Sequence, residues 1–109
     1  MTVFELSKAC GFSELSVPFP EKEVKGCYIG DLLSWVMGRA KENDAWITIM
    51  SNQNVIAVAS LADVACVILA EDVIPDGELI SLAESKGINL LTSPHPLYET
   101  AKMIASLSI

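Results

Sequence analysis

Short apolar segments recur along this chain at intervals of about twenty residues, and each is followed by a stretch long enough for one helix. The segments centre near Cys27, Thr48, Val67 and Leu90. Parallel strands need a crossover connection between them, and this spacing leaves just enough chain for a helical one. The pattern predicts an α/β fold made of βα units, with a mainly parallel sheet of four to five strands.

Two of the segments are apolar on both faces. Residues 45–50 read AWITIM and residues 64–69 read VACVIL. Strands with this composition lie in the middle of a sheet that helices cover on both sides. We therefore expect a three-layer α/β/α architecture. The chain has 109 residues, the size of one domain, so we expect a single domain over residues 1–109.

Helices are expected between and around the strands. Thr2 and Glu5 have the spacing of a capping box at the first helix, and Asp31 is placed to cap the second. Residues 12–17 alternate weakly and fit either a strand or an extended arm. The expected helices cover residues 2–10, 32–40, 55–62, 77–86 and 97 to about 107.

The helix expected at residues 55–62, VIAVASLA, is apolar nearly all round. A helix of this kind is buried on both sides. In so small a chain, a second subunit would supply the second cover, and small residues in the helix, Ala57, Ala59, Ser60 and Ala62, would allow close approach. The sequence therefore predicts a homodimer.

Acidic residues outnumber basic ones by fourteen to seven, which gives a formal net charge of −7. No Lys or Arg occurs between Lys41 and Lys86, whereas acidic residues are frequent there. Nucleic acids and anionic membranes are bound by clustered cations, so neither is an expected partner. The acidic excess is best explained by solubility, and a docking surface for a basic partner protein is the alternative.

The cysteines and tryptophans are expected to be structural. Cys10, Cys27 and Cys66 are odd in number and show no CxxC spacing, which argues against both disulfides and zinc. We expect buried thiols in a reducing compartment, and Trp35 and Trp46 in the core. No apolar run is long enough to cross a bilayer and no signal peptide is recognisable, so we expect a cytoplasmic protein.

Common catalytic motifs are absent from the sequence. There is no GxxxxGK[ST], GxGxxG, GxSxG or HExxH pattern. The single histidine, His95, is expected at the surface where a helix begins. We therefore expect no catalytic residue, no metal and no cofactor. The alternative is a small enzyme in which His95 works with Glu99 or Asp72 as acid–base groups.

Polar residues follow the predicted strands. In open parallel sheets, ligands bind beyond the carboxyl ends of the strands. Hydroxyl and amide groups at three helix starts could hold a polar small molecule, although three carboxylates in the set would repel a phosphate. Helix capping and loop solvation are the alternative roles. The candidate ligand-binding residues are Asp31, Ser51, Asn52, Asn54, Glu71, Asp72, Thr92, Ser93, His95 and Tyr98.

Several segments in order resemble a known family. They are DLLSWVM, WITI, NVIAVASLADVACVIL, and KGI followed by TSP. Over roughly Val3 to Ala105 the chain is similar to the DRTGG domain family, relatives of the N-terminal domain of HPr kinase/phosphorylase. The resemblance implies a three-layer α/β domain like that N-terminal domain.

The resemblance also implies a function. In HPr kinase, phosphotransfer takes place in a separate domain with a phosphate-binding loop, and this sequence has no counterpart of it. DRTGG domains elsewhere accompany CBS domains and acetyl-transfer enzymes as regulatory or dimerising modules. We therefore expect a non-catalytic regulatory or protein-interaction module, a homodimer that could sense a small ligand at the strand ends and could also bind a partner protein.

The residues that name the family are replaced in this chain. The turn after WITI often carries Asp-Arg in the family, and the loop after the next strand Thr-Gly-Gly; here they read SNQN at 51–54 and AED at 70–72. The last helix often begins with Asp-Thr, where this chain has Pro96 and Leu97. The expected fold and dimer do not depend on these residues.

Overall fold

The computed structural model describes residues 1–109 and confirms an α/β fold. Five strands form one sheet in the order β1-β5-β4-β3-β2. Strands β2 to β5 are parallel, and β1 pairs antiparallel with β5. The elements are α1 (Val3–Cys10), β1 (Ser13–Ser16), β2 (Gly26–Ile29), α2 (Leu33–Arg39), β3 (Asp44–Thr48), α3 (Asn54–Ala62), β4 (Cys66–Leu69), α4 (Gly77–Lys86), β5 (Leu90–Thr92) and α5 (Leu97–Ala105).

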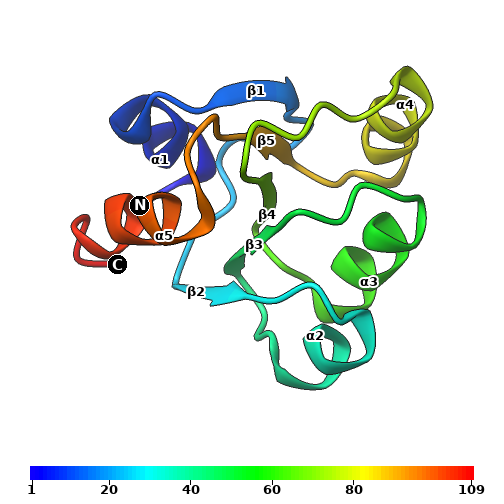
Figure 1. Ribbon diagram of the computed structural model, residues 1–109, viewed down its shortest axis with the longest axis horizontal. Helices are drawn as coiled ribbons and strands as arrows, with labels where there is room; N and C mark the ends of the chain where they lie inside the picture. Colours follow the sequence, from blue (N-terminus) through cyan, green and yellow to red (C-terminus); the bar gives the residue numbers. More distant parts are fainter.

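The sheet is the middle of three layers, as predicted. Helices α1 and α5 lie on one side, and α2, α3 and α4 lie on the other (Figure 1). Successive side chains of β3 point into different cores, because strand residues alternate between faces: Ile47 packs with α1 and α5, and Trp46 with α2 to α4. Of the three interior strands, β3 and β4 are buried throughout.

Capping residues set the ends of several helices where the sequence predicted them. At α1 the Thr2 hydroxyl accepts from the Glu5 amide at 3.1 Å, and the Glu5 carboxylate accepts from the Thr2 amide at 2.9 Å. These hydrogen bonds lower the pKa of Glu5. Asp76 caps α4, which covers residues 77–86 as predicted and ends at Gly87 in the left-handed conformation.

The two edges of the sheet differ. Residues 12–17, which fitted a strand or an arm, contain β1, a short polar strand with a register irregularity between Glu14 and Ser16. Its sequence is SELS. The opposite edge is β2, whose sequence GCYI is largely apolar. None of the helices has the length and hydropathy needed to span a membrane.

Two predictions about burial were wrong, both for residues of edge elements. Trp35 is exposed because α2 has only seven residues and buries only Val36. Cys27 is exposed on β2, while Cys10 and Cys66 are buried free thiols as predicted. Within this chain α3 is buried on one side, with Ala59 in the core and Leu61 72% exposed, and cover of the other side by a second subunit stays a prediction.

Candidate functional site

Asp31, predicted as a helix cap, instead joins two strand ends. Helix α2 begins after Leu32 without a side-chain cap. The Asp31 carboxylate accepts from the Thr48 hydroxyl at 2.7 Å and from the Ile49 amide at 2.9 Å. The cap prediction was therefore wrong, because the end of the neighbouring parallel strand offers two donors to the same carboxylate.

Glu71 and Asp72 follow β4 in a strained turn. Both have positive φ angles, 60° and 58°, which side-chain-bearing residues rarely adopt. Their amides donate to the carbonyl groups of His95 and Ser93 at 2.8 and 3.1 Å. The Glu71 carboxylate accepts from the Leu97 amide at 2.7 Å and thereby caps the start of α5.

The residues after β5 form a buried hydroxyl pair beneath an exposed surface. Ser93 and Thr100 are fully buried, and their hydroxyl oxygens lie 2.8 Å apart. The His95 amide donates to the Ser93 hydroxyl at 3.2 Å, but the His95 ring is exposed, as predicted, and makes no hydrogen bond. Tyr98 is exposed on α5, and Thr92 is the last residue of β5.

The turn before α3 holds the remaining candidates. The Asn52 side chain accepts from the Asn54 amide at 2.9 Å, and Ser51 is half-buried beside them. Of the ten candidate residues only Asn54 and His95 line a cavity. His95 shares a hollow of about 420 Å³ with Glu99, and Asp72 does not line it.

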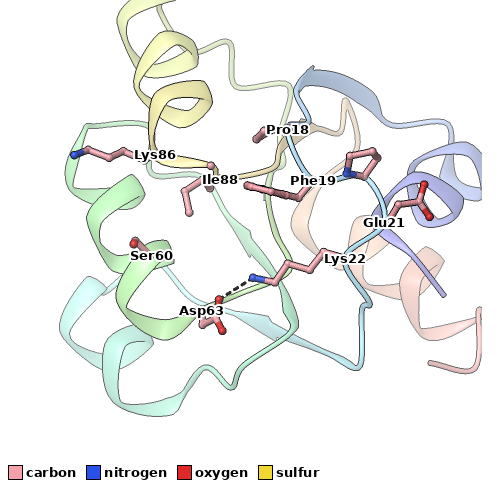
Figure 2. A pocket seen from close by; sticks show the side chains of 10 residues that line it. Pro18, Phe19, Glu21, Lys22, Ser60, Asp63, Lys86 and Ile88 are labelled. Atoms are coloured by element: carbon pink, nitrogen blue, oxygen red, sulfur yellow. Dashed lines mark hydrogen bonds and ion pairs between the residues drawn. The ribbon is translucent and has the colours of Figure 1, made fainter.

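The largest cavity lies at the opposite ends of the strands from these candidates, where β4 and β5 begin (Figure 2). It measures about 700 Å³. Its walls are the loop between β1 and β2 and the carboxyl ends of α3 and α4. The lining residues are Pro18, Phe19, Pro20, Glu21, Lys22, Ser60, Asp63, Lys86, Gly87 and Ile88. We name this space the loop cavity.

The loop cavity was not predicted, because no element or site was expected over residues 18–23. A signal was present in the Pro18-Phe19-Pro20 run. Two prolines restrict the backbone on either side of a large aromatic residue, which is an unusual composition for a solvated turn.

One buried side chain fixes the loop cavity's aromatic wall. Asn89 is 2% exposed. Its amide group accepts from the Phe19 N–H at 2.9 Å and donates to the Phe19 carbonyl at 2.8 Å and to the Ala65 carbonyl at 2.9 Å. The Phe19 ring nevertheless stands 57% exposed, against Gly87, where a Cβ atom would come within 2.8 Å of the ring.

The charges around the loop cavity are not all paired. Lys22 forms an ion pair with Asp63 at 2.7 Å, marked by the dashed line in Figure 2. Lys86 is exposed and forms no ion pair. Glu21 extends to the opposite side from Lys22 (Figure 2).

The thiols are not activated. Cys27, Ala45 and Cys66 occupy one row across β2, β3 and β4. Packing of the Cys27 thiol toward α5, together with the Asp44 carboxylate, raises the Cys27 pKa from 9.0 to about 11, although the residue itself is exposed. Complete burial raises the pKa of Cys66 further. No group of three or more His, Cys, Asp or Glu side chains is placed to hold a metal ion.

Comparison with known proteins identifies the class of domain that this fold represents. The family model described as the DRTGG domain matches residues 21–107. The chain therefore belongs to the DRTGG domain family, as its sequence segments suggested.

A solved structure shares the fold. It contains the CBS and DRTGG domains of the regulatory region of a pyrophosphatase from Clostridium perfringens, complexed with the activator diadenosine tetraphosphate. The TM-score is 0.73 at 17% sequence identity, over 94% of this chain and 45% of the other. This chain thus spans less than half the length of that structure. No curated protein matches the sequence significantly.

Proposed function

We propose that this chain is a non-catalytic regulatory module that acts as a homodimer. One observation carries the proposal: the short segment from the end of β2 through α2 exposes four large apolar side chains at one edge of the sheet, with Ile29 on the α5 side and the other three at α2. Ile29, Leu32, Trp35 and Met37 are 46%, 58%, 53% and 48% exposed. We name this the β2–α2 surface. Several exposed apolar side chains at one edge of a sheet are typical of interaction sites.

The β2–α2 surface has the composition of an interface centre. The Arg39 guanidinium lies 3.9 Å from the centre of the Trp35 ring and holds it by a cation–π contact. Trp and Arg are enriched among residues that dominate binding energy. The surface adjoins β2, an edge strand whose outer backbone groups have no strand partner within the chain.

A second copy of the chain is the occupant that the charges favour. The protein carries a net charge of −7, so two copies repel each other over most of their surfaces. Between residues 29 and 39 the only acidic residue is Asp31, whose carboxylate already accepts two hydrogen bonds. Two copies can therefore meet through this segment with little repulsion, in a symmetric contact of like with like.

The hydrogen bonds of the predicted strand-end residues support a non-catalytic role. Asp31, Glu71 and Ser93 hold neighbouring backbone or hydroxyl groups. Side chains bound in this way stabilise the ends of the sheet. The name of the regulatory region from Clostridium perfringens supports a regulatory role for the shared fold. Ligand binding at the strand ends stays a prediction.

Sedimentation velocity over a micromolar concentration series tests the dimer. We expect the wild-type chain to sediment as a dimer and Trp35→Glu to sediment as a folded monomer. Ile74→Glu is the control, because Ile74 is an even more exposed apolar residue, on the loop before α4. A monomeric wild-type chain at every concentration would overturn the proposal.

Leu61→Glu separates this surface from the interface predicted on α3. Leu61 stands exposed on α3, outside the β2–α2 surface. We expect Leu61→Glu to remain dimeric. If Leu61→Glu dissociates the dimer and Trp35→Glu does not, the contact lies on α3 and the β2–α2 surface is the wrong one.

A further inference from the structure

We propose that the loop cavity binds a nucleoside monophosphate, a planar heteroaromatic ring joined to one phosphate group. The inference rests on the proposed regulatory function only in assuming that such a module responds to a ligand. It does not require a dimer.

The size and rigidity of the loop cavity suit a small molecule. Its volume of about 700 Å³ lies within the range of small-ligand sites. The wall is already in place: besides the Asn89 contacts to Phe19, the Val3 and Phe4 amides donate to the Lys22 and Pro20 carbonyls, each at 3.0 Å. A preformed wall lowers the entropic cost of binding.

The apolar part of the loop cavity favours a flat ring. The Phe19 ring lies between Gly87 and solvent, with Pro18 and Pro20 on either side in sequence and Ile88 beside it (Figure 2). An exposed aromatic ring on a clamped backbone offers a stacking surface, and nucleobases stack on such rings irrespective of sequence. A ring that only completed the core would be covered.

The polar part of the loop cavity holds two lysines, Lys22 and Lys86, and two carboxylates, Glu21 and Asp63. Lys22 enters the space from the loop, whereas Lys86 lines it with its stem and extends its exposed ammonium group away from Phe19 (Figure 2). The Lys86 ammonium has no carboxylate partner. A phosphate could therefore pair with Lys86 and compete with Asp63 for Lys22, while the Ser60 hydroxyl lies on the same wall as a further donor.

NMR titration of the full chain with AMP locates the site. We expect amide shifts at residues 18–22, 60–63 and 86–88. Shifts confined to 31, 51–54, 71–72 and 92–98 would place the ligand at the strand ends and overturn the inference, as would the absence of shifts at millimolar AMP. Adenosine and inorganic phosphate, titrated separately, should each bind more weakly than AMP; equal binding of phosphate alone would overturn the ring contact.

Variants separate the two contacts. Phe19→Ala should weaken AMP binding about tenfold, the usual effect of losing one base-stacking ring. Tyr98→Ala removes an exposed ring elsewhere and should leave the AMP affinity unchanged. Lys86→Gln should weaken AMP binding, whereas Lys102→Gln on α5 should not.

The AMP affinity of the Asp63→Asn variant tests whether the bound ligand is negatively charged. The amide tolerates the left-handed backbone of residue 63 and releases Lys22. We expect AMP to bind about two- to fivefold more tightly, the effect of freeing one exposed ion pair. Weaker binding would overturn an anionic ligand. Running the titration on monomeric Trp35→Glu keeps the result independent of the proposed dimer.

Discussion

The carboxylate of Asp31 joins the ends of two parallel strands by accepting from the Thr48 hydroxyl at 2.7 Å and the Ile49 amide at 2.9 Å. We expect Asp31→Ala to lower the free energy of unfolding by about 1–3 kcal/mol, because it leaves two donors without their acceptor. Asp31→Asn keeps an acceptor oxygen and should lose less. Urea denaturation measures both changes, and equal losses would show that the negative charge matters more than the acceptor.

The strained turn after β4 should tolerate glycine. Asp72 has a φ of 58°, and its side chain makes no hydrogen bond. Asp72→Gly should raise the unfolding free energy by up to about 1 kcal/mol, since glycine adopts this conformation without a steric penalty. Asp72→Val should lower it. Thermal unfolding compares the variants, and a valine variant more stable than the glycine variant would contradict the strain.

The free energy of unfolding should fall at alkaline pH, because the Cys27 and Cys66 thiols have higher pKa values in the folded chain than in the unfolded chain. The Cys27 pKa is raised from 9.0 to about 11, and burial raises that of Cys66 as well. Between pH 9.0 and about 11 the unfolded chain releases the Cys27 proton, whereas the folded chain retains it. The unfolding free energy therefore decreases as the pH rises through this range. Below pH 9.0 the contribution is constant.

Urea denaturation of the wild type and Cys66→Ala across this pH range measures the thiol contribution to stability. The alanine variant removes one of the titrating thiols and should show a shallower decline. Identical slopes for the two proteins would mean that Cys66 does not take part.

The two sides of the β5–α5 turn should respond differently to substitution. Thr100→Val keeps the shape of a buried side chain but deprives Ser93 of its hydroxyl partner, so we expect a loss of about 1–3 kcal/mol. His95→Ala removes an exposed ring without a hydrogen bond and should change stability by less than about 0.5 kcal/mol. Calorimetry checks both values. Loss of turnover of any small metabolite in His95→Ala would instead support the alternative of a small enzyme.

Local patterns in the sequence predicted the elements whose causes are local. The Thr2–Glu5 capping box defines the start of α1, and the doubly apolar segments became the buried strands β3 and β4. The family segments predicted the domain class. These features depend on residue type and spacing within a few turns of chain.

Features that depend on contacts between residues far apart in the chain could not be predicted from the sequence. Asp31 had the position of a helix cap, yet the end of β3 supplies better donors. Trp35 had the pattern of a core residue, yet its helix lies at the sheet edge with too few turns to bury two faces. The loop cavity depends on Asn89, seventy residues from Phe19 in sequence.

The unequal edges of the sheet bear on assembly size. The polar, irregular β1 discourages another strand from docking, while apolar β2 with its neighbouring helix invites contact. In the proposed homodimer, β2 lies at the contact and β1 resists pairing with a further strand, so we expect the assembly to close at two copies.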